Sequence, residues 1–210
     1  MTFTRAIGLA CNKVIVLIVD GLALSRIHPN VLTFIGLLIN LAAAVLLASG
    51  RFLAGGLVIL GAALFDMVDG RVARQTNQVT KFGGFFDSVL DRYSDLGLLM
   101  GLLVYYASIS RYFYVVLVAV VMTASVLISY TRSRAENIIP LCKVGFMERP
   151  ERIVLLIIGA LFNRMAPVLW VIAVLGNITV IHRMWYTWQE CRRLEEAQLG
   201  RAAQPGVVNQ

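Results

Sequence analysis

Six long apolar segments run through this sequence and restrict the folds open to it. Apolar stretches can cross a lipid bilayer only as helices or as strands of a closed barrel, because lipid offers the backbone no hydrogen-bond partner. A barrel strand needs only ~9–11 residues, far fewer than most of these segments hold. We therefore predict an all-α, polytopic membrane protein with six transmembrane helices. The segments cover residues 31–50, 53–74, 83–108, 112–132, 151–163 and 166–188.

The ends of the chain differ from its apolar middle. Residues 3–27 carry charges at intervals, so no uncharged run reaches the ~20 residues that a span needs. This segment is typical of an amphipathic helix that lies on the membrane surface, and Pro29 ends it. The predicted organisation is an interfacial amphipathic helix (1–28), one six-helix membrane domain (29–190) and a polar cytoplasmic tail (191–210).

The distribution of charge supports six spans with both ends in the cytoplasm. With six crossings, the outer loops hold only Arg51, Arg111 and Arg164, and the other 16 of the 19 lysines and arginines lie on the inner side. That asymmetry follows the positive-inside rule. The net charge of +7 then reflects topology and an anionic substrate, so no nucleic-acid partner is expected. We predict a multi-pass protein of the cytoplasmic membrane whose acidic stretch faces the cytoplasm, in contact with membrane lipids.

Five aspartates lie in the facing parts of the second and third apolar segments, where buried charge costs several kcal/mol by order of magnitude. Asp66 and Asp69 share one face of the second predicted helix. Asp87, Asp91 and Asp95 follow at steps of four on the third and form a stripe. The linker between the helices is short, which predicts antiparallel neighbours whose acidic faces meet.

Facing carboxylates need a positive counter-charge. Hard divalent cations with oxygen ligands provide it, and two Mg²⁺ or Mn²⁺ ions would balance four aspartates. Arg74 can bind a phosphate bidentately, while Gly70, Gly83 and Gly84 let a bulky group approach the helices. The residues therefore indicate a metal-dependent site for a phosphate ester. A proton relay or ion path in a cation or proton transporter is the alternative.

The spacing Asp66-x2-Asp69-Gly70-x2-Ala73-Arg74-x8-Gly83-x3-Asp87-x3-Asp91 resembles the signature of the CDP-alcohol phosphatidyltransferase family at every defined position. This resemblance implies a homodimeric enzyme. In the implied reaction, an alcohol attacks CDP-diacylglycerol and CMP is released. The resemblance implies that Asp66, Asp69 and Asp87 bind the metals, and that Asp91 contacts one metal and acts as general base. It also implies a set of residues that bind CDP-diacylglycerol: Asn30, Val31, Leu32, Thr33, Gly70, Arg74 and Thr80.

A second cluster, of basic residues, indicates what kind of alcohol accepts the phosphatidyl group. These cations gather on the predicted inner side and suit an acceptor that is itself anionic. The positive-inside bias and contact with anionic lipid headgroups are the alternative explanation for these residues. Asp95 falls outside the signature, and we expect it to support the site or to pair with Arg92. The basic residues are Arg132, Arg134, Lys143, Arg149, Arg152 and Arg183.

The segments "SYTRSRAE", "ERPERIVLL" and "FFDSVLDRYSD" resemble the branch of the family that makes phosphatidylinositol phosphate from inositol 3-phosphate. Phosphatidylglycerophosphate synthases, which use glycerol 3-phosphate, usually show Ala-Asp-Lys where this chain has Leu90-Asp91-Arg92. Glycerol 3-phosphate remains the alternative acceptor. The resemblance implies five residues that bind the acceptor phosphate: Arg132, Arg134, Arg149, Arg152 and Arg183.

Overall fold

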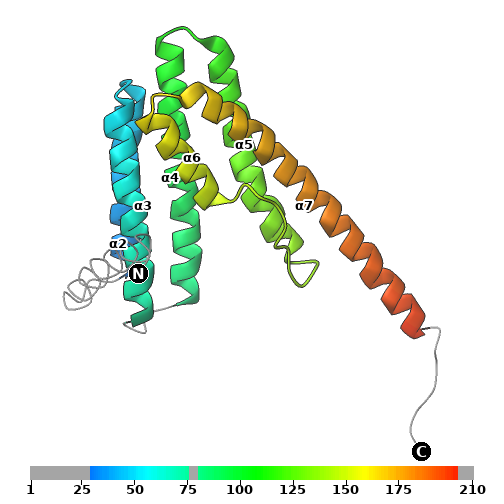
Figure 1. Cartoon of the computed structure of the whole chain (residues 1–210). Coiled ribbons are helices and arrows are strands. Elements are labelled where there is room, and N and C mark those ends of the chain that lie inside the picture. Colours follow the sequence, from blue (N-terminus) through cyan, green and yellow to red (C-terminus); the bar gives the residue numbers. More distant parts are fainter. Residues whose placement is uncertain (1–28, 76–79, 203–210) are drawn as a thin grey trace, which may run out of the picture.

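The computed structural model describes the backbone of residues 29–75 and 80–202, and the side chains of residues 30–66 and 80–199. Within these ranges the chain forms helices and no strand, which confirms the all-α prediction. The interfacial helix predicted for residues 3–27 lies outside the described residues. The helices, labelled as in Figure 1, are α2 (Pro29–Ala48), α3 (Phe52–Gln75), α4 (Lys81–Ser108), α5 (Tyr112–Ala135), α6 (Arg149–Leu161) and α7 (Met165–Ala202).

Most helix ends fall within a few residues of the predicted bounds, and α7 is the exception. The apolar pattern ends near residue 188, yet α7 continues to Ala202. The added turns are rich in Glu, Arg, Leu and Ala, which favour helix without needing a buried face. The Arg192 guanidinium also lies 4.9 Å from the centre of the Trp188 ring, a cation–π contact within this extension. The segment predicted as a polar tail is therefore helical as far as Ala202.

The predicted break between the fifth and sixth segments is confirmed. Asn163 lies between α6 and α7 with a φ of 51°, in the left-handed region that ends helices. The break lets α7 turn back across α5 (Figure 1). At the other end of α6, Arg149 and Arg152 lie beside α3 and α4.

The helices pack on a shared apolar core. α2 lies against both α3 and α4, α6 packs on α3 and α7, and α5 packs on α4 and α7. α3 and α4 run antiparallel, as predicted (Figure 1). Among the described residues, however, the main neighbours of α3 are α2 and α6, so the acidic helices are not packed broadly on each other. The core includes Ala43, Leu47, Leu98, Leu102, Val121, Leu156 and Leu169.

The exposed apolar side chains and the length of three helices are typical of a membrane protein. Asn30–Ala48, Tyr112–Ala135 and Met165–Leu199 are long and apolar enough to cross one. Val45, Val116 and Ile181 are 66, 63 and 65% exposed, which lipid tolerates better than water. α6 has 13 residues, or ~20 Å of helix, against a hydrocarbon core of ~30 Å. The chain is therefore a helical membrane protein, and the count of six spans stays a prediction.

Close packing of α2 on α4 depends on Gly101. A Cβ at this position would overlap the carbonyl oxygen of Ala44 on the facing helix. We expect Gly101→Ala to lower the free energy of unfolding by about 1–3 kcal/mol, because the two backbones must move apart. Gly61→Ala is the matched control, since a Cβ there meets nothing within 4 Å. Thermal unfolding in detergent checks this, and equal midpoints for the two variants would contradict the packing described.

Candidate active site

The N-terminal ends of α2 and α4 lie side by side at one edge of the site. Thr80 caps α4, and its side-chain oxygen accepts a hydrogen bond from the Gly83 backbone N–H at 2.9 Å. A Cβ on Gly83 would lie 3.0 Å from Thr80 Oγ1 and 3.4 Å from Asn30 Oδ1. Two residues predicted to bind the donor, Asn30 and Thr80, are therefore brought together over a glycine that leaves room beside them.

The other residues that were predicted to bind the donor differ in how exposed their side chains are. The Leu32 side chain is buried, at 2% exposure, so only its backbone is available to a ligand, whereas Val31 is half exposed. Thr33 is partly buried. Gly70 and Arg74 lie on the part of α3 whose side chains are outside the described set. Their role in donor binding stays a prediction.

Two of the aspartates meet at one guanidinium. Asp66 Oδ2 on α3 lies 3.0 Å from Arg149 Nη2, and Asp91 Oδ1 on α4 lies 2.9 Å from Arg149 Nη1. The acidic faces of the two helices thus converge on a residue of α6. Gly36 on α2 makes room for this arrangement, because a Cβ there would lie 2.9 Å from Asp66 Oδ1. Sequence reasoning missed Gly36, since no spacing rule links it to an aspartate thirty residues later.

Asp95 has a different partner from the one expected. Its side chain is 7% exposed, and Oδ2 accepts a hydrogen bond from Arg152 Nη2 at 2.5 Å. Its other oxygen lies 3.4 Å from Arg149 Nε. Arg92, the partner suggested by sequence proximity, donates instead to the backbone oxygen of Ser88 in its own helix. A buried carboxylate pairs with the buried Arg152 because an unpaired charge there would be costly.

The described carboxylates suit hard metal ions in their chemistry. Carboxylate oxygens are the donors that Mg²⁺ and Mn²⁺ prefer. Asp66 and Asp91 already share one positive charge, that of Arg149. The negative charge of Asp87 repels both of these carboxylates. Within the described side chains, no three acidic, histidine or cysteine groups lie close enough to hold one ion. Asp69 falls outside those side chains, so the four-aspartate metal site stays a prediction.

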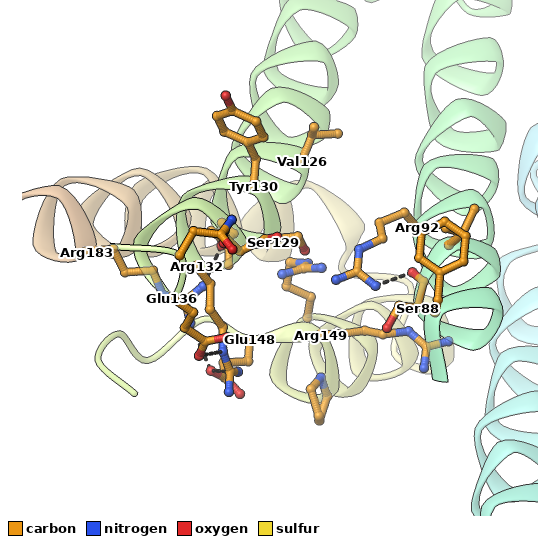
Figure 2. A pocket seen from close by; sticks show the side chains of 17 residues that line it. Ser88, Arg92, Val126, Ser129, Tyr130, Arg132, Glu136, Glu148, Arg149 and Arg183 are labelled. Atoms are coloured by element: carbon orange, nitrogen blue, oxygen red, sulfur yellow. Dashed lines mark hydrogen bonds and ion pairs between the residues drawn. The ribbon is translucent and has the colours of Figure 1, made fainter. Parts of the chain in front are cut away.

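A cavity of about 880 Å³ opens beside these aspartates, between α4, α5, α6 and α7 (Figure 2). Its lining combines basic and hydroxyl groups with apolar side chains and with two glutamates that pair with arginines, and the excess of basic groups suits a polar anion. Four of the five predicted acceptor residues line it, and Arg134 does not. Arg92 also lines it, although sequence reasoning gave Arg92 no role in binding. We call this space the arginine cavity, after Arg92, Arg132, Arg149, Arg152 and Arg183.

Glu148 holds two of these arginines at one wall of the arginine cavity. Its Oε1 lies 3.0 Å from Arg132 Nη1 and 2.9 Å from Arg183 Nη2 (Figure 2). Arg132 also pairs with Glu136 at 3.0 Å. Arg183 is 1% exposed and donates to the backbone oxygens of Ile128 and Val144. It therefore ties α7 to α5 and to the loop before α6, in addition to charging the cavity.

The sequence matches a known family over most of its length. A sequence model of the CDP-alcohol phosphatidyltransferase family matches residues 26–189. The archaetidylinositol phosphate synthase of Methanothermobacter thermautotrophicus is 33% identical over 181 residues, covering 83% of this chain and 89% of that protein. The phosphatidylinositol phosphate synthase of Mycobacterium tuberculosis is 34% identical over 182 residues, covering 81% and 84%.

Solved structures agree with the sequence relatives. The M. tuberculosis phosphatidylinositol phosphate synthase with CDP-DAG bound has a TM-score of 0.77 and 28% identity, covering 94% of this chain and 98% of that one. The same enzyme in complex with manganese and citrate has a TM-score of 0.75 and 29% identity, covering 92% and 91%. The helical fold, the aspartate signature and these matches agree, and the chain belongs to the CDP-alcohol phosphatidyltransferase family.

Proposed function

We propose that this enzyme transfers the phosphatidyl group of CDP-diacylglycerol to inositol 3-phosphate, releasing CMP and forming phosphatidylinositol phosphate. The observation that carries this proposal is the position of Arg149. Its guanidinium contacts Asp66 and Asp91, and it also lines the arginine cavity. An anionic acceptor in that cavity would therefore lie beside the proposed base. The names of the archaeal and mycobacterial relatives share an inositol phosphate product, which supports the same acceptor.

The proposed reaction assigns a separate task to each wall of the site. Asn30, Thr80 and Arg74 hold the cytidine diphosphate part of the donor. Asp91 removes the proton from the acceptor hydroxyl, whose oxygen then attacks the lipid-side phosphorus. The bond from that phosphorus to the CMP oxygen breaks, and CMP leaves. The bound divalent ions, Mg²⁺ or Mn²⁺, would neutralise and polarise the diphosphate, and the proposed ligands are Asp66, Asp69, Asp87 and Asp91.

Glycerol 3-phosphate is the second candidate acceptor. The arginine cavity recognises a phosphate through Arg132 and its neighbours, and that recognition does not require an inositol ring. A free inositol, serine or glycerol would not use the cluster of cations. The charge of the cavity therefore favours a phosphorylated alcohol over a neutral one, and the hydroxyl-bearing Ser129 and Ser133 are placed to contact the rest of it.

The proposed setting is the cytoplasmic membrane. Six helices would cross it, the segment 1–28 would lie on its inner surface, and the site would open to the cytoplasm. With six crossings, 16 of the 19 lysines and arginines would lie on the inner side, and that asymmetry supports the orientation. We further propose a homodimer with one site in each protomer.

Release of CMP tests the proposal. Purified protein with Mg²⁺ and CDP-diacylglycerol should release CMP with inositol 3-phosphate and should stop when EDTA removes the metal. Free inositol should support at most a small fraction of that rate. A higher kcat/KM with glycerol 3-phosphate would replace the inositol assignment and leave the chemistry intact. No acceptor-dependent CMP release with any of these alcohols would reject the transferase mechanism and favour the ion-transport alternative.

A further inference from the structure

We propose that Arg92 binds the acceptor phosphate and thereby selects phosphorylated alcohols over neutral ones. This inference rests on the proposed function. Arg92 lies in α4 directly after Asp91 and lines the arginine cavity. Figure 2 shows its side chain leaving α4 and reaching into the cavity, toward the wall formed by α5. Arg149 lines the same cavity and lies 2.9 Å from Asp91, so an anion held there would lie close to the residue that takes the hydroxyl proton.

Arg92 differs from the other arginines of the cavity in its ion pairing. Arg149 contacts three aspartates, and Arg152 contacts Asp95. Arg132 and Arg183 share Glu148. In the described part of the chain, Arg92 has no ion pair, and its recorded partner is a neutral carbonyl one turn back in the same helix. The positive charge of Arg92 is therefore the least compensated in the cavity.

Because Arg92 lacks a carboxylate partner among the described side chains, a phosphate dianion can bind it at a lower free-energy cost than it can bind the paired arginines. Arg152 and Arg183 are 4% and 1% exposed. Drawing either one toward a ligand would break an ion pair, with Asp95 or with Glu148, that a buried guanidinium makes, and this is expensive. Arg92 is exposed and gives up only a hydrogen bond to Ser88, whose carbonyl keeps its place in the helix. A phosphate gains a charge-assisted contact from Arg92 at little expense, and the planar guanidinium can make that contact bidentate.

Two sources can supply such a phosphate to Arg92. One is the acceptor in solution, and the other is the headgroup of an anionic lipid, because long arginine side chains can reach the membrane surface. The position of Arg92 in the lining of a cavity that also holds Arg149 favours the acceptor. The lipid source predicts a dependence on membrane composition, which the acceptor does not.

Arg92→Gln tests the inference, with Arg193→Gln as the control. The Arg193 side chain is 81% exposed and lies on the distal part of α7, outside the lining of the cavity. We expect Arg92→Gln to raise KM for inositol 3-phosphate about tenfold or more, as loss of a charged hydrogen bond predicts. KM for CDP-diacylglycerol and the thermal midpoint should stay unchanged, and Arg92→Lys should recover part of the loss. Arg193→Gln should match the wild type.

Three results would overturn the inference: an unchanged acceptor KM, an equal rise in donor and acceptor KM, or an effect seen in anionic but not in neutral nanodiscs. Binding of inorganic phosphate, measured by calorimetry, separates this inference from the function on which it rests. If no alcohol supports CMP release but Arg92→Gln weakens phosphate binding, the transferase proposal fails and the anion site stands. If CMP release is normal and phosphate binding is unaffected by Arg92→Gln, only the Arg92 inference fails.

Discussion

Asp91→Asn should lower kcat by about 10²–10⁴-fold while the enzyme still binds CDP-diacylglycerol. The amide cannot accept the proton of the acceptor hydroxyl at neutral pH. Its carbonyl oxygen can still accept a hydrogen bond from Arg149 Nη1, which lies 2.9 Å from the carboxylate in the structure. The local arrangement of α4 and α6 should therefore survive while the base is lost.

CMP release and equilibrium binding of the donor, measured on the same preparation, check this expectation. Glu195→Gln is a suitable control, since it makes the same chemical change at an exposed position on α7. Turnover of Asp91→Asn within a few-fold of the control would exclude Asp91 as the base. Loss of donor binding together with turnover would instead assign Asp91 mainly to the donor and metal shell.

Arg152→Ala should have the largest effect on stability of any single substitution considered. It removes the partner at 2.5 Å from Asp95, a residue that is 5% exposed, and leaves only the more distant contact with Arg149. Breaking a buried ion pair from one side typically costs about 3–5 kcal/mol. We expect a clear fall in the thermal midpoint, and a rise in acceptor KM well above any rise in donor KM at temperatures where the variant is folded.

A double-mutant cycle separates the pair from its surroundings. Asp95→Leu should also destabilise the protein, whereas the double variant with Arg152→Met should recover much of the loss, because apolar groups can replace a buried pair. The exposed pair Arg193 and Glu190, 3.8 Å apart, provides the control cycle, which should show no measurable coupling. Additive effects of Asp95→Leu and Arg152→Met would contradict the buried pair as a stabilising unit.

Much of the fold follows from the sequence because its signals are local. Apolar runs and helix breakers define α2 to α6 to within a few residues. The end of α7 was missed because its last turns depend on helix propensity and contacts such as Arg192 on Trp188, which hydropathy does not detect. The antiparallel order of α3 and α4 and the meeting of their acidic faces followed from the sequence, but it gave no sign that α2 and α6 are the main neighbours of α3 among the described residues.

The residues of the site could be predicted where they occur at a fixed spacing in the sequence. The aspartates and the basic residues before and within α6 could be named, and the structure brings Asp66, Asp91 and Arg149 together. The partner of Asp95 could not, because Arg152 is 57 residues away and sequence proximity favours Arg92. Arg134 could not be excluded either, since helix position alone does not show that it misses the cavity lined by Arg132.

The central claim is that the aspartates of α3 and α4 hold the divalent ions at which the lipid diphosphate is cleaved. Anomalous diffraction from crystals grown with Mn²⁺ and CDP-diacylglycerol tests it most directly. The account predicts manganese peaks within coordination distance of the Asp66, Asp69, Asp87 and Asp91 carboxylates and of the donor diphosphate. Manganese bound elsewhere, with the diphosphate in place and these carboxylates free of metal, would contradict it.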